Sequence, residues 1–421
     1  RSGIPRPFRR HGVPTSRLLA RLRLASGHHS DRLGRATSVH KVLHLTNTSI
    51  PTDARILREL AALAEAPRLQ MHAIGVHEEP AVPGPPSVRL QEVRPISTRA
   101  TWLPRGPRYV LAMIELTVQL VVRGWRLRPS IIHCHDTMVL PAGAILKLLL
   151  KSTLVYDAHE LESDKAGQTP VLSKATLAIE RRCWPVVDAF ITVSSSIATW
   201  YEENLGPKPT LCLLNSPATN PTAANDAESK PDVKSDLGLA ADQPLFVYVG
   251  ALEPGRGIDL ILRAFATLTD DAHLAFVGGG SLVESVKAAS AVETNVHYHP
   301  PVPHDSLVQF IRTADGAFCL VEDHSLSDYY CLPNKLFEYA FADLRVIASR
   351  LPDIEAMVDQ YDLGVCIDRD EESVRAAVRA LLDQPTRGTL CDLTPLRWDT
   401  QADNLLSFYS ELAPADPAPV S

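Results

Sequence analysis

A glycine-rich segment in the second half of the chain has the composition of an anion-binding turn. Residues 250–257 (GALEPGRG) follow the apolar run at 245–249 and precede apolar residues at helical spacing. Glycines let backbone N–H groups approach an anion at the positive end of a helix, and the guanidinium group of Arg256 adds further donors. The segment therefore fits a diphosphate, although its spacing is neither that of a P-loop nor GxGxxG. A tight strand-to-helix turn without a ligand is the alternative.

Two further segments of the second half could contact the same ligand. Residues 278–280 (GGG) end an apolar run and permit the close approach of a ligand or of a neighbouring backbone. Residues 332–339 (LPNKLFEY) indicate a helix that starts after a proline. Free N–H groups and Lys335 can hold a phosphate there, while Glu338, one turn further, can accept hydrogen bonds from ribose hydroxyls. A surface ion pair between Lys335 and Glu338 fits the same spacing.

Histidines and acids end two apolar runs of the first half. They are His133, His135 and Asp136 in SIIHCHD, and Asp157, His159 and Glu160 in STLVYDAHE. In adjacent parallel strands these groups gather at one edge of the sheet, where an imidazole can bind a sugar hydroxyl or move a proton. The alternatives are interior histidines with satisfied hydrogen bonds, and a metal site on the HxH pair, for which no third ligand has a diagnostic spacing. The DRD string at 368–370 is interpreted as a helix cap, so no metal site is predicted.

The elements that position these residues alternate between short β-branched runs and helical runs, the pattern of parallel βαβ units. This pattern covers residues 41–214 and returns at 244–395, and the intervening 215–243 has the composition of a linker. The expected fold class is α/β, with two Rossmann-like domains facing a cleft. Such sheets bind ligands at the carboxyl ends of their strands. Residues 396–421 are expected to form a helix, which either completes the second domain or packs back on the first, and a tail.

Composition narrows the classes of function. The 421 residues are 45% hydrophobic and 22% charged, which indicates a folded chain of two or three domains. The net charge of −7 excludes a nucleic-acid binder that depends on bulk positive charge, and no nucleic-acid partner is predicted. Seven widely spaced cysteines without a CxxC pair indicate reduced thiols. Because no apolar run reaches the ~18 residues of a membrane span, a cytoplasmic location is expected.

Two basic segments suggest contact with an anionic membrane surface. Residues 1–40 hold nine arginines against one acid and are predicted to be a mobile arm, with a tail without function and a mitochondrial-type transit segment as alternatives. The apolar run 109–122 is predicted to be a helix. Its flanking arginines are Arg105, Arg108, Arg123, Arg126 and Arg128. This helix either lies on a membrane or packs inside the first domain.

Taken together, these segments resemble the retaining nucleotide-sugar glycosyltransferases of the GT-B fold, the "glycosyl transferase group 1" family, over about residues 41–412. The resemblance is carried by VLHLTNTSIPTDARILREL, IIHCHD, LVYDAHELES, DAFITVSSSI, VYVGALEPGRGIDLILRAF, LAFVGGG and CLPNKLFEYAFADLRVIAS. It implies transfer of a sugar from a nucleoside-diphosphate donor to a hydroxyl of a glycan, lipid-linked or small-molecule acceptor. It also implies front-face displacement without a metal ion or other cofactor, because two cations and a helix N-terminus neutralise the leaving diphosphate.

The resemblance also assigns roles to particular residues. Arg256 and Lys335 match the cations that hold the donor diphosphate, and Glu338 matches the second glutamate of the family's E-x7-E motif, which binds the ribose. His159 matches the histidine beside the donor sugar and the reaction centre. The catalytic set is therefore His159, Arg256 and Lys335. The predicted donor contacts are Gly250, Arg256, Gly279, Tyr330, Asn334, Lys335, Leu336 and Glu338.

Three positions depart from the family pattern. Tyr330 stands where the first glutamate of E-x7-E is usual, Ala251 stands where many members have an arginine, and the loop 46–52 lacks glycines. Tyr330 and Ala251 keep a non-catalytic sugar-nucleotide-binding protein as one alternative to the glycosyltransferase. A nucleotide-sugar 2-epimerase-like isomerase of the same fold is the other, although the PNKLFEY string argues against it.

Overall fold

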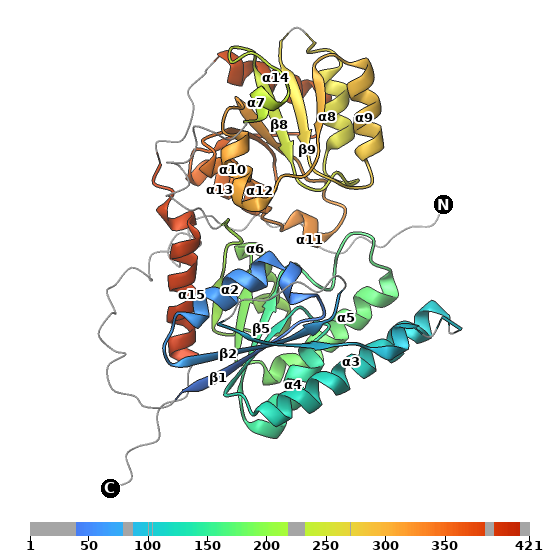
Figure 1. Ribbon diagram of the computed structural model, residues 1–421, viewed down its shortest axis with the longest axis vertical. Coiled ribbons are helices and arrows are strands. Elements are labelled where there is room, and N and C mark those ends of the chain that lie inside the picture. Colours follow the sequence, from blue (N-terminus) through green and yellow to red (C-terminus); the bar gives the residue numbers. More distant parts are fainter. Residues whose placement is uncertain are drawn as a thin grey trace. The chain divides into compact units, whose positions relative to one another are not determined.

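The computed structural model of the protein describes residues 39–78, 87–99, 101–102, 104–217, 232–269, 271–383 and 391–412. Within these residues the chain forms two parallel sheets flanked by helices (Figure 1). We call the described residues from 39 to 217 the first lobe and those from 232 to 383 the second lobe. The expected α/β class, with two Rossmann-like sheets, is confirmed.

The first lobe contains a seven-stranded sheet in the order β3-β2-β1-β4-β5-β6-β7. Its strands are β1 (His40–Leu45), β2 (Leu69–Val76), β3 (Arg89–Val93), β4 (Ile131–His135), β5 (Thr153–Ala158), β6 (Ala189–Thr192) and β7 (Thr210–Cys212). Its α-helices are α2 (Ala54–Ala64), α3 (Arg105–Leu127), α4 (Leu140–Leu150), α5 (Pro170–Cys183) and α6 (Ser195–Leu205). Successive strand residues point to opposite faces. Val42 therefore packs with α2, while Leu43 packs with α3 and α4.

The second lobe contains a six-stranded sheet in the order β10-β9-β8-β11-β12-β13. Its strands are β8 (Leu245–Val249), β9 (His273–Val277), β10 (Val296–His299), β11 (Gly316–Cys319), β12 (Arg345–Ser349) and β13 (Gly364–Ile367). Its helices are α7 (Val233–Asp236), α8 (Ile258–Phe265), α9 (Val283–Val292), α10 (His304–Ile311), α11 (Leu326–Tyr329), α12 (Asn334–Phe341), α13 (Pro352–Gln360) and α14 (Glu371–Asp383). Val247 packs with α10, α12 and α13, and Phe246 packs with α8, α9 and α14 on the other face.

Both sheets have the same reversal of strand order, between β1 and β4 in the first lobe and between β8 and β11 in the second. Open α/β sheets bind ligands beyond the carboxyl ends of the strands at such a point. In the first lobe the strand register pairs His44 of β1 with His133 of β4. In the second lobe Gly250 directly follows β8. The topology thus brings polar residues of distant segments to one edge of each sheet.

Aspartates cap the starts of two helices, and the cap expected in the DRD string is one of them. The Oδ1 atom of Asp53 accepts hydrogen bonds from the backbone N–H groups of Arg55 and Ile56, at the start of α2. In the DRD string, Oδ1 of Asp370 accepts from the backbone N–H of Ser373 at 2.8 Å, in the first turn of α14. The aspartates at these positions therefore satisfy free N–H groups of the first helical turn.

The last helix, α15 (Trp398–Leu412), packs on the first lobe although it follows the second lobe in the chain. Its Leu405 and Tyr409 belong to the same apolar cluster as Val42 of β1 and Ile56 of α2, and α15 lies beside α2 (Figure 1). Of the two arrangements considered for this segment, the return to the first lobe is observed.

The expected linker and the expected basic arm have different outcomes. The linker expected at 215–243 ends earlier, because α7 begins at Val233, which is fully buried in the core of the second lobe. Of the basic arm expected at 1–40, only the last two residues are described, and His40 already belongs to β1. No helix among the described residues is long and apolar enough to cross a membrane.

Candidate active site

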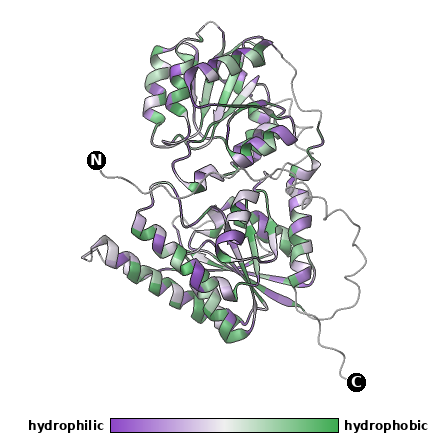
Figure 2. Cartoon of the chain, turned by 180° about the vertical axis from the view of Figure 1, so that it is seen from behind, coloured by the Kyte–Doolittle hydropathy of each residue, from purple (hydrophilic) through white to green (hydrophobic). Residues whose placement is uncertain are grey.

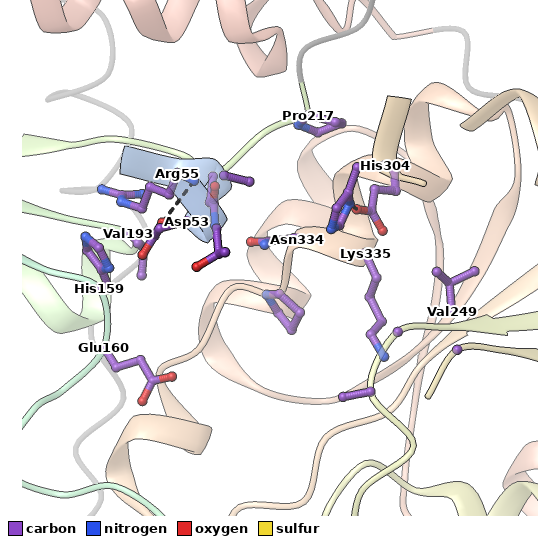
Figure 3. Close-up of a pocket in the computed structure, with 18 of the residues that line it drawn as sticks. Asp53, Arg55, His159, Glu160, Val193, Pro217, Val249, His304, Asn334 and Lys335 are labelled. Carbon is purple, nitrogen blue, oxygen red and sulfur yellow. Dashed lines mark hydrogen bonds and ion pairs between the residues drawn. The ribbon is translucent and has the colours of Figure 1, made fainter. Parts of the chain in front are cut away.

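A pocket of about 1250 Å³ lies at the carboxyl ends of the strands and takes residues from both lobes (Figure 3). It brings together most of the residues that the sequence singled out. They are His159 of the first lobe and Gly250, Arg256, Gly279, Asn334, Lys335 and Glu338 of the second.

The glycines of the second lobe serve two different purposes. Gly250 has a φ of 111°, a conformation that favours glycine. A Cβ on Gly278 would lie 1.9 Å from the carbonyl oxygen of Gly250, so this glycine is required for the two turns to pack together. A Cβ on Gly279 would meet only Pro301, at 3.4 Å. The neighbouring backbone therefore requires Gly278, whereas Gly279 lines the pocket.

Two cations face the pocket without a carboxylate partner. Neither Arg256 nor Lys335 forms an ion pair with a carboxylate among the described residues. The Nζ atom of Lys335 lies 3.7 Å from the centre of the Tyr248 ring. Burial lowers the pKa of Lys335 to about 8, and the like charge of Arg256 acts in the same direction. An anion between these two side chains would remove both the repulsion and the unpaired charge.

Glu338 is turned to a histidine and not to Lys335. Glu338 is 6% exposed, and its Oε1 atom lies 3.7 Å from Nδ1 of His304, the first residue of α10. The nearby carboxylate of Glu338 raises the pKa of His304. The surface ion pair between Lys335 and Glu338, which the spacing also fitted, does not form. A buried carboxylate at the pocket wall is thus available to a hydroxyl-bearing ligand.

His159 is held by carboxylates at the first-lobe wall of the pocket. Its Nε2 atom lies 3.1 Å from Oδ2 of Asp157, and its backbone N–H donates to Oδ1 of Asp136 at 3.2 Å. Burial opposes its protonation, but Asp136 and Asp157 outweigh burial and raise the pKa of His159 to about 9. Asp157 is fixed by Arg55 of α2, whose guanidinium donates to both carboxylate oxygens at 3.1 and 3.3 Å. His159 is therefore an imidazolium at neutral pH and a hydrogen-bond donor.

Three buried histidines stack behind His159. The ring centre of His133 lies 4.3 Å from that of His44 and 4.2 Å from that of His135, with interplanar angles of 26° and 23°. Nδ1 of His44 lies 2.9 Å from Nε2 of His135, whose Nδ1 atom is 3.2 Å from Nε2 of His159. Burial lowers the pKa of each of the three stacked histidines. They are therefore neutral and form a hydrogen-bonded support for the charged His159.

By distance alone, parts of this network could hold a metal ion. Ligand atoms lie within 4.8 Å of one another in two groups, one of His44, Glu59, His133 and His135, and one of His135, Asp157 and His159. Nearly parallel rings direct their nitrogen lone pairs side by side, whereas zinc takes ligands that converge tetrahedrally. The hydroxyl of Tyr409 also lies 2.6 Å from Nδ1 of His133, so this nitrogen already has a partner. We interpret the group as a hydrogen-bonded network.

Two predicted donor contacts do not line the pocket, and the prediction is corrected for them. Leu336 is fully buried in the apolar core of the second lobe, because it lies on the inner face of α12. Tyr330 packs against the apolar cluster of the first lobe, and its carbonyl oxygen accepts a hydrogen bond from Ser194 at 2.7 Å. Tyr330, which stands where the family usually has a glutamate, therefore contacts the first lobe.

Several residues of the pocket wall were not predicted from the sequence. Arg55, Arg58 and His304 line the pocket. Arg58 donates to Oδ1 of Asn215, and its guanidinium carbon lies 5.4 Å from the centre of the Trp398 ring. The segment RILRE could have indicated both arginines, because Arg55 and Arg58 are spaced so that they share one helix face. His304 carries no such signal.

The comparisons with known proteins agree with this geometry. The family model "Glycosyl transferases group 1" matches residues 243–384, and "Glycosyl transferase 4-like domain" matches 52–216. A D-inositol 3-phosphate glycosyltransferase of Acidothermus cellulolyticus is 24% identical over 73% of this chain and 75% of the relative. The same enzyme of Thermomonospora curvata is 27% identical over 67% of this chain and 71% of the relative.

Solved structures show the same fold at low sequence identity. Sucrose-phosphate synthase from Thermosynechococcus elongatus is 17% identical, with a TM-score of 0.70 over 89% of this chain and 99% of that chain. Anabaena HepE in complex with UDP and glucose is 14% identical, with a TM-score of 0.60 over 89% of this chain and 95% of that chain. The fold and the pocket between two Rossmann-like sheets define a GT-B glycosyltransferase. The chain belongs to the group 1 glycosyltransferases.

Proposed function

We propose that the protein is a retaining, metal-independent glycosyltransferase whose donor is a nucleoside-diphosphate sugar bound in the pocket. The observation that carries the proposal is the pair Arg256 and Lys335, two cations that face the pocket without a carboxylate partner among the described residues. The oxygens of a diphosphate supply the missing negative charge. HepE, a solved structure of the same fold, is in complex with UDP-glucose, which supports this class of donor.

The remaining second-lobe residues fit the other parts of such a donor. Asn334 is the first residue of α12, whose free N–H groups add positive potential beside Lys335. Glu338 would accept hydrogen bonds from ribose hydroxyls, in place of its contact with His304. Gly279 leaves room for the donor to approach the protein backbone, since a Cβ there would meet only Pro301.

In the proposed mechanism an acceptor hydroxyl attacks the anomeric carbon on the side from which the diphosphate leaves. The bond from the anomeric carbon to the phosphate oxygen breaks, the bond to the acceptor oxygen forms, and the acceptor proton passes to the leaving phosphate oxygen. Arg256 and Lys335 stabilise the charge that develops on the diphosphate, so no metal ion is required for this task. His159 donates a hydrogen bond to the donor sugar from the first-lobe wall.

The acceptor is proposed to enter along the first-lobe wall. Asn47, Thr48, Ser49 and Thr52 line the pocket there and offer hydrogen bonds to a hydroxyl-bearing molecule, such as a glycan, a lipid-linked sugar or a small polyol. The cysteines are free thiols, which supports work in a reducing, cytoplasmic compartment.

Product analysis tests the proposed reaction. The protein is incubated with nucleoside-diphosphate sugars and a panel of acceptors, and the anomeric configuration of the product is read by proton NMR. The expected product has the configuration of the donor, and it forms in the presence of a chelator. An inverted product, isomerised donor without transfer, or activity that a chelator abolishes and a divalent cation restores would each contradict part of the proposal.

A further inference from the structure

The outward face of α3 is apolar, where a surface helix ordinarily carries polar side chains. The exposed apolar residues of this face, each 41–57% exposed, are Val110, Leu111, Ile114, Val118, Val122 and Trp125. At 3.6 residues per turn they fall within an arc of about 120°. Leu116 and Leu120 on the inner face are buried in the first lobe. Packing inside the lobe therefore accounts for one side of α3 and leaves the outer side unexplained.

The apolar surface continues beyond α3. The neighbouring helix α4 exposes Ile145, Leu148 and Leu149, and Trp102, just before α3, is 81% exposed. Figure 2 shows α3 and α4 side by side with many apolar residues in both. We call this surface, formed by the residues named here and in the preceding paragraph, the α3–α4 face. Apolar patches of this extent on a soluble domain mark an interaction site.

The charges around the α3–α4 face are positive. Arg108, Arg126, Arg128 and Lys151 have no carboxylate partner among the described residues. The single acid of α3, Glu115, accepts hydrogen bonds from the backbone N–H groups of Ile96 and Ser97, at 2.7 and 2.8 Å. An apolar stripe beside free cations is the arrangement of a helix that lies in the surface of an anionic bilayer.

A second copy of the chain fits this face less well. In a two-fold contact the same surface of both copies meets, so the unpaired cations of one copy would face those of the other. The membrane surface supplies instead the negative charge that the face lacks.

We propose that the α3–α4 face docks on an anionic lipid bilayer and that the acceptor is lipid-linked. The acceptor part rests on the proposed glycosyl transfer. The start of α3 lies at the edge of the sheet that carries the pocket, because the hydroxyl of Tyr109 lies 3.5 Å from the sulfur of Met138. Met138 lies just beyond Asp136, whose Oδ1 atom accepts a hydrogen bond from the backbone N–H of His159. A lipid-linked acceptor in the bilayer surface would therefore lie close to the first-lobe wall of the pocket.

Vesicle co-sedimentation of the full chain tests the docking. The protein is mixed with vesicles of phosphatidylcholine alone and with vesicles that also contain phosphatidylglycerol. Binding is expected to the second kind, and to weaken with salt. The variant Leu111→Gln/Ile114→Gln/Val118→Gln should bind more than about tenfold more weakly, because three apolar side chains no longer enter the bilayer. The matched control is Val292→Gln in the second lobe, which is 77% exposed in the wild type and should bind as the wild type does.

The charge contribution is tested by Arg108→Gln/Arg126→Gln, which should lose most of the preference for phosphatidylglycerol. Absence of vesicle binding by the wild type, or equal binding by the triple variant, would overturn the proposal. A wild-type oligomer that the triple variant converts to a monomer would assign the face to a second copy instead. Thermal stabilisation by nucleotides is measured on the same samples, so that a failure of the donor site is recognised separately from a failure of docking.

Discussion

The ammonium nitrogen of Lys335 lies 3.7 Å from the centre of the Tyr248 ring and has no carboxylate partner among the described residues. A cation–π contact contributes only ~0.5–2 kcal/mol and does not neutralise the charge. The free protein therefore keeps an unpaired cation in a largely buried place. Bound diphosphate would remove this cost, which links stability to donor binding.

Replacement of Lys335 by methionine should stabilise the free protein at neutral pH by about 1–3 kcal/mol. Burial lowers the pKa of Lys335 to about 8, so the charged form is penalised in the folded state below this pH. The penalty declines as pH rises from about 8 to the unfolded lysine value, and the advantage of Lys335→Met should shrink in the same window. Urea unfolding between about pH 6 and 10 measures the difference in unfolding free energy between Lys335→Met and the wild type.

Lys287 offers a matched control for this variant. Its Nζ atom also lies over a tyrosine ring, 5.3 Å from the centre of Tyr298, but Lys287 is exposed and pairs with Glu284 at 2.9 Å. Lys287→Met should therefore leave stability nearly unchanged. If Lys335→Met is no more stable than the wild type, the cost assigned to its unpaired charge is wrong.

Glu338→Gln should weaken binding of the nucleoside part of the donor and leave binding of the diphosphate part nearly unchanged. The carboxylate is 6% exposed at the pocket wall, and its loss removes a charged acceptor for ribose hydroxyls. We expect nucleotide affinity to fall by about tenfold, and affinity for inorganic pyrophosphate to stay within about twofold of the wild-type value. Calorimetry with both ligands measures the two affinities. An equal loss for pyrophosphate would mean that Glu338 acts through Lys335 or the fold.

The charge of His159 should be visible in the pH dependence of stability. Its pKa, raised to about 9, means that His159 stabilises the fold most below the unfolded histidine value of about 6.5, and that this contribution is lost as pH rises through about 9. The difference in unfolding free energy between wild type and His159→Gln should therefore shrink between about pH 6 and 10.

Asp136→Asn tests the cause of this shift. Asp136 has a φ of 64°, a conformation that asparagine accepts, so the variant should keep the fold. Loss of the carboxylate should lower the pKa of His159 and move the loss of stabilisation to lower pH. A pH dependence identical to that of the wild type would assign the shift to Asp157 alone.

Adjacent glycines should respond differently to alanine. Gly278→Ala would place a Cβ 1.9 Å from the carbonyl oxygen of Gly250 and should destabilise the protein by more than about 3 kcal/mol. Gly279→Ala, whose Cβ would lie 3.4 Å from Pro301, should leave the melting temperature nearly unchanged but weaken nucleotide binding, because the methyl group enters the pocket. Thermal unfolding with and without nucleotide compares the pair. The same effect from both substitutions would contradict the distinct positions described here.

Much of the second-lobe site could be predicted from sequence because its residues come from short continuous segments. Residues 250–257 and Lys335 with Glu338 are each local to one turn or one helix start, and the pocket takes residues from both segments. Leu336 was misplaced because a run of consecutive residues at a helix start does not show which one faces inward. Its full burial follows from the packing of α12 on the sheet.

The first-lobe network could be predicted only in part. His159 and Asp157 lie close together in the chain, but Arg55 is 102 residues from Asp157 and is brought to it by the strand order. His44 pairs with His133 in the register of β1 and β4, which no local pattern encodes. For the helix expected at 109–122, the sequence left burial and membrane contact as alternatives, because apolar spacing alone does not tell which side of a helix is covered.

Thermal unfolding with UDP, GDP, ADP, TDP and their sugar conjugates tests the central claim most directly, since a ligand of the folded state raises the melting temperature by mass action. We predict that nucleotides of one base, and their sugar conjugates, stabilise the wild type, and that Lys335→Met largely loses this stabilisation. A folded wild type that no nucleotide stabilises, or a Lys335→Met variant that is stabilised as strongly, would contradict a donor site at Lys335.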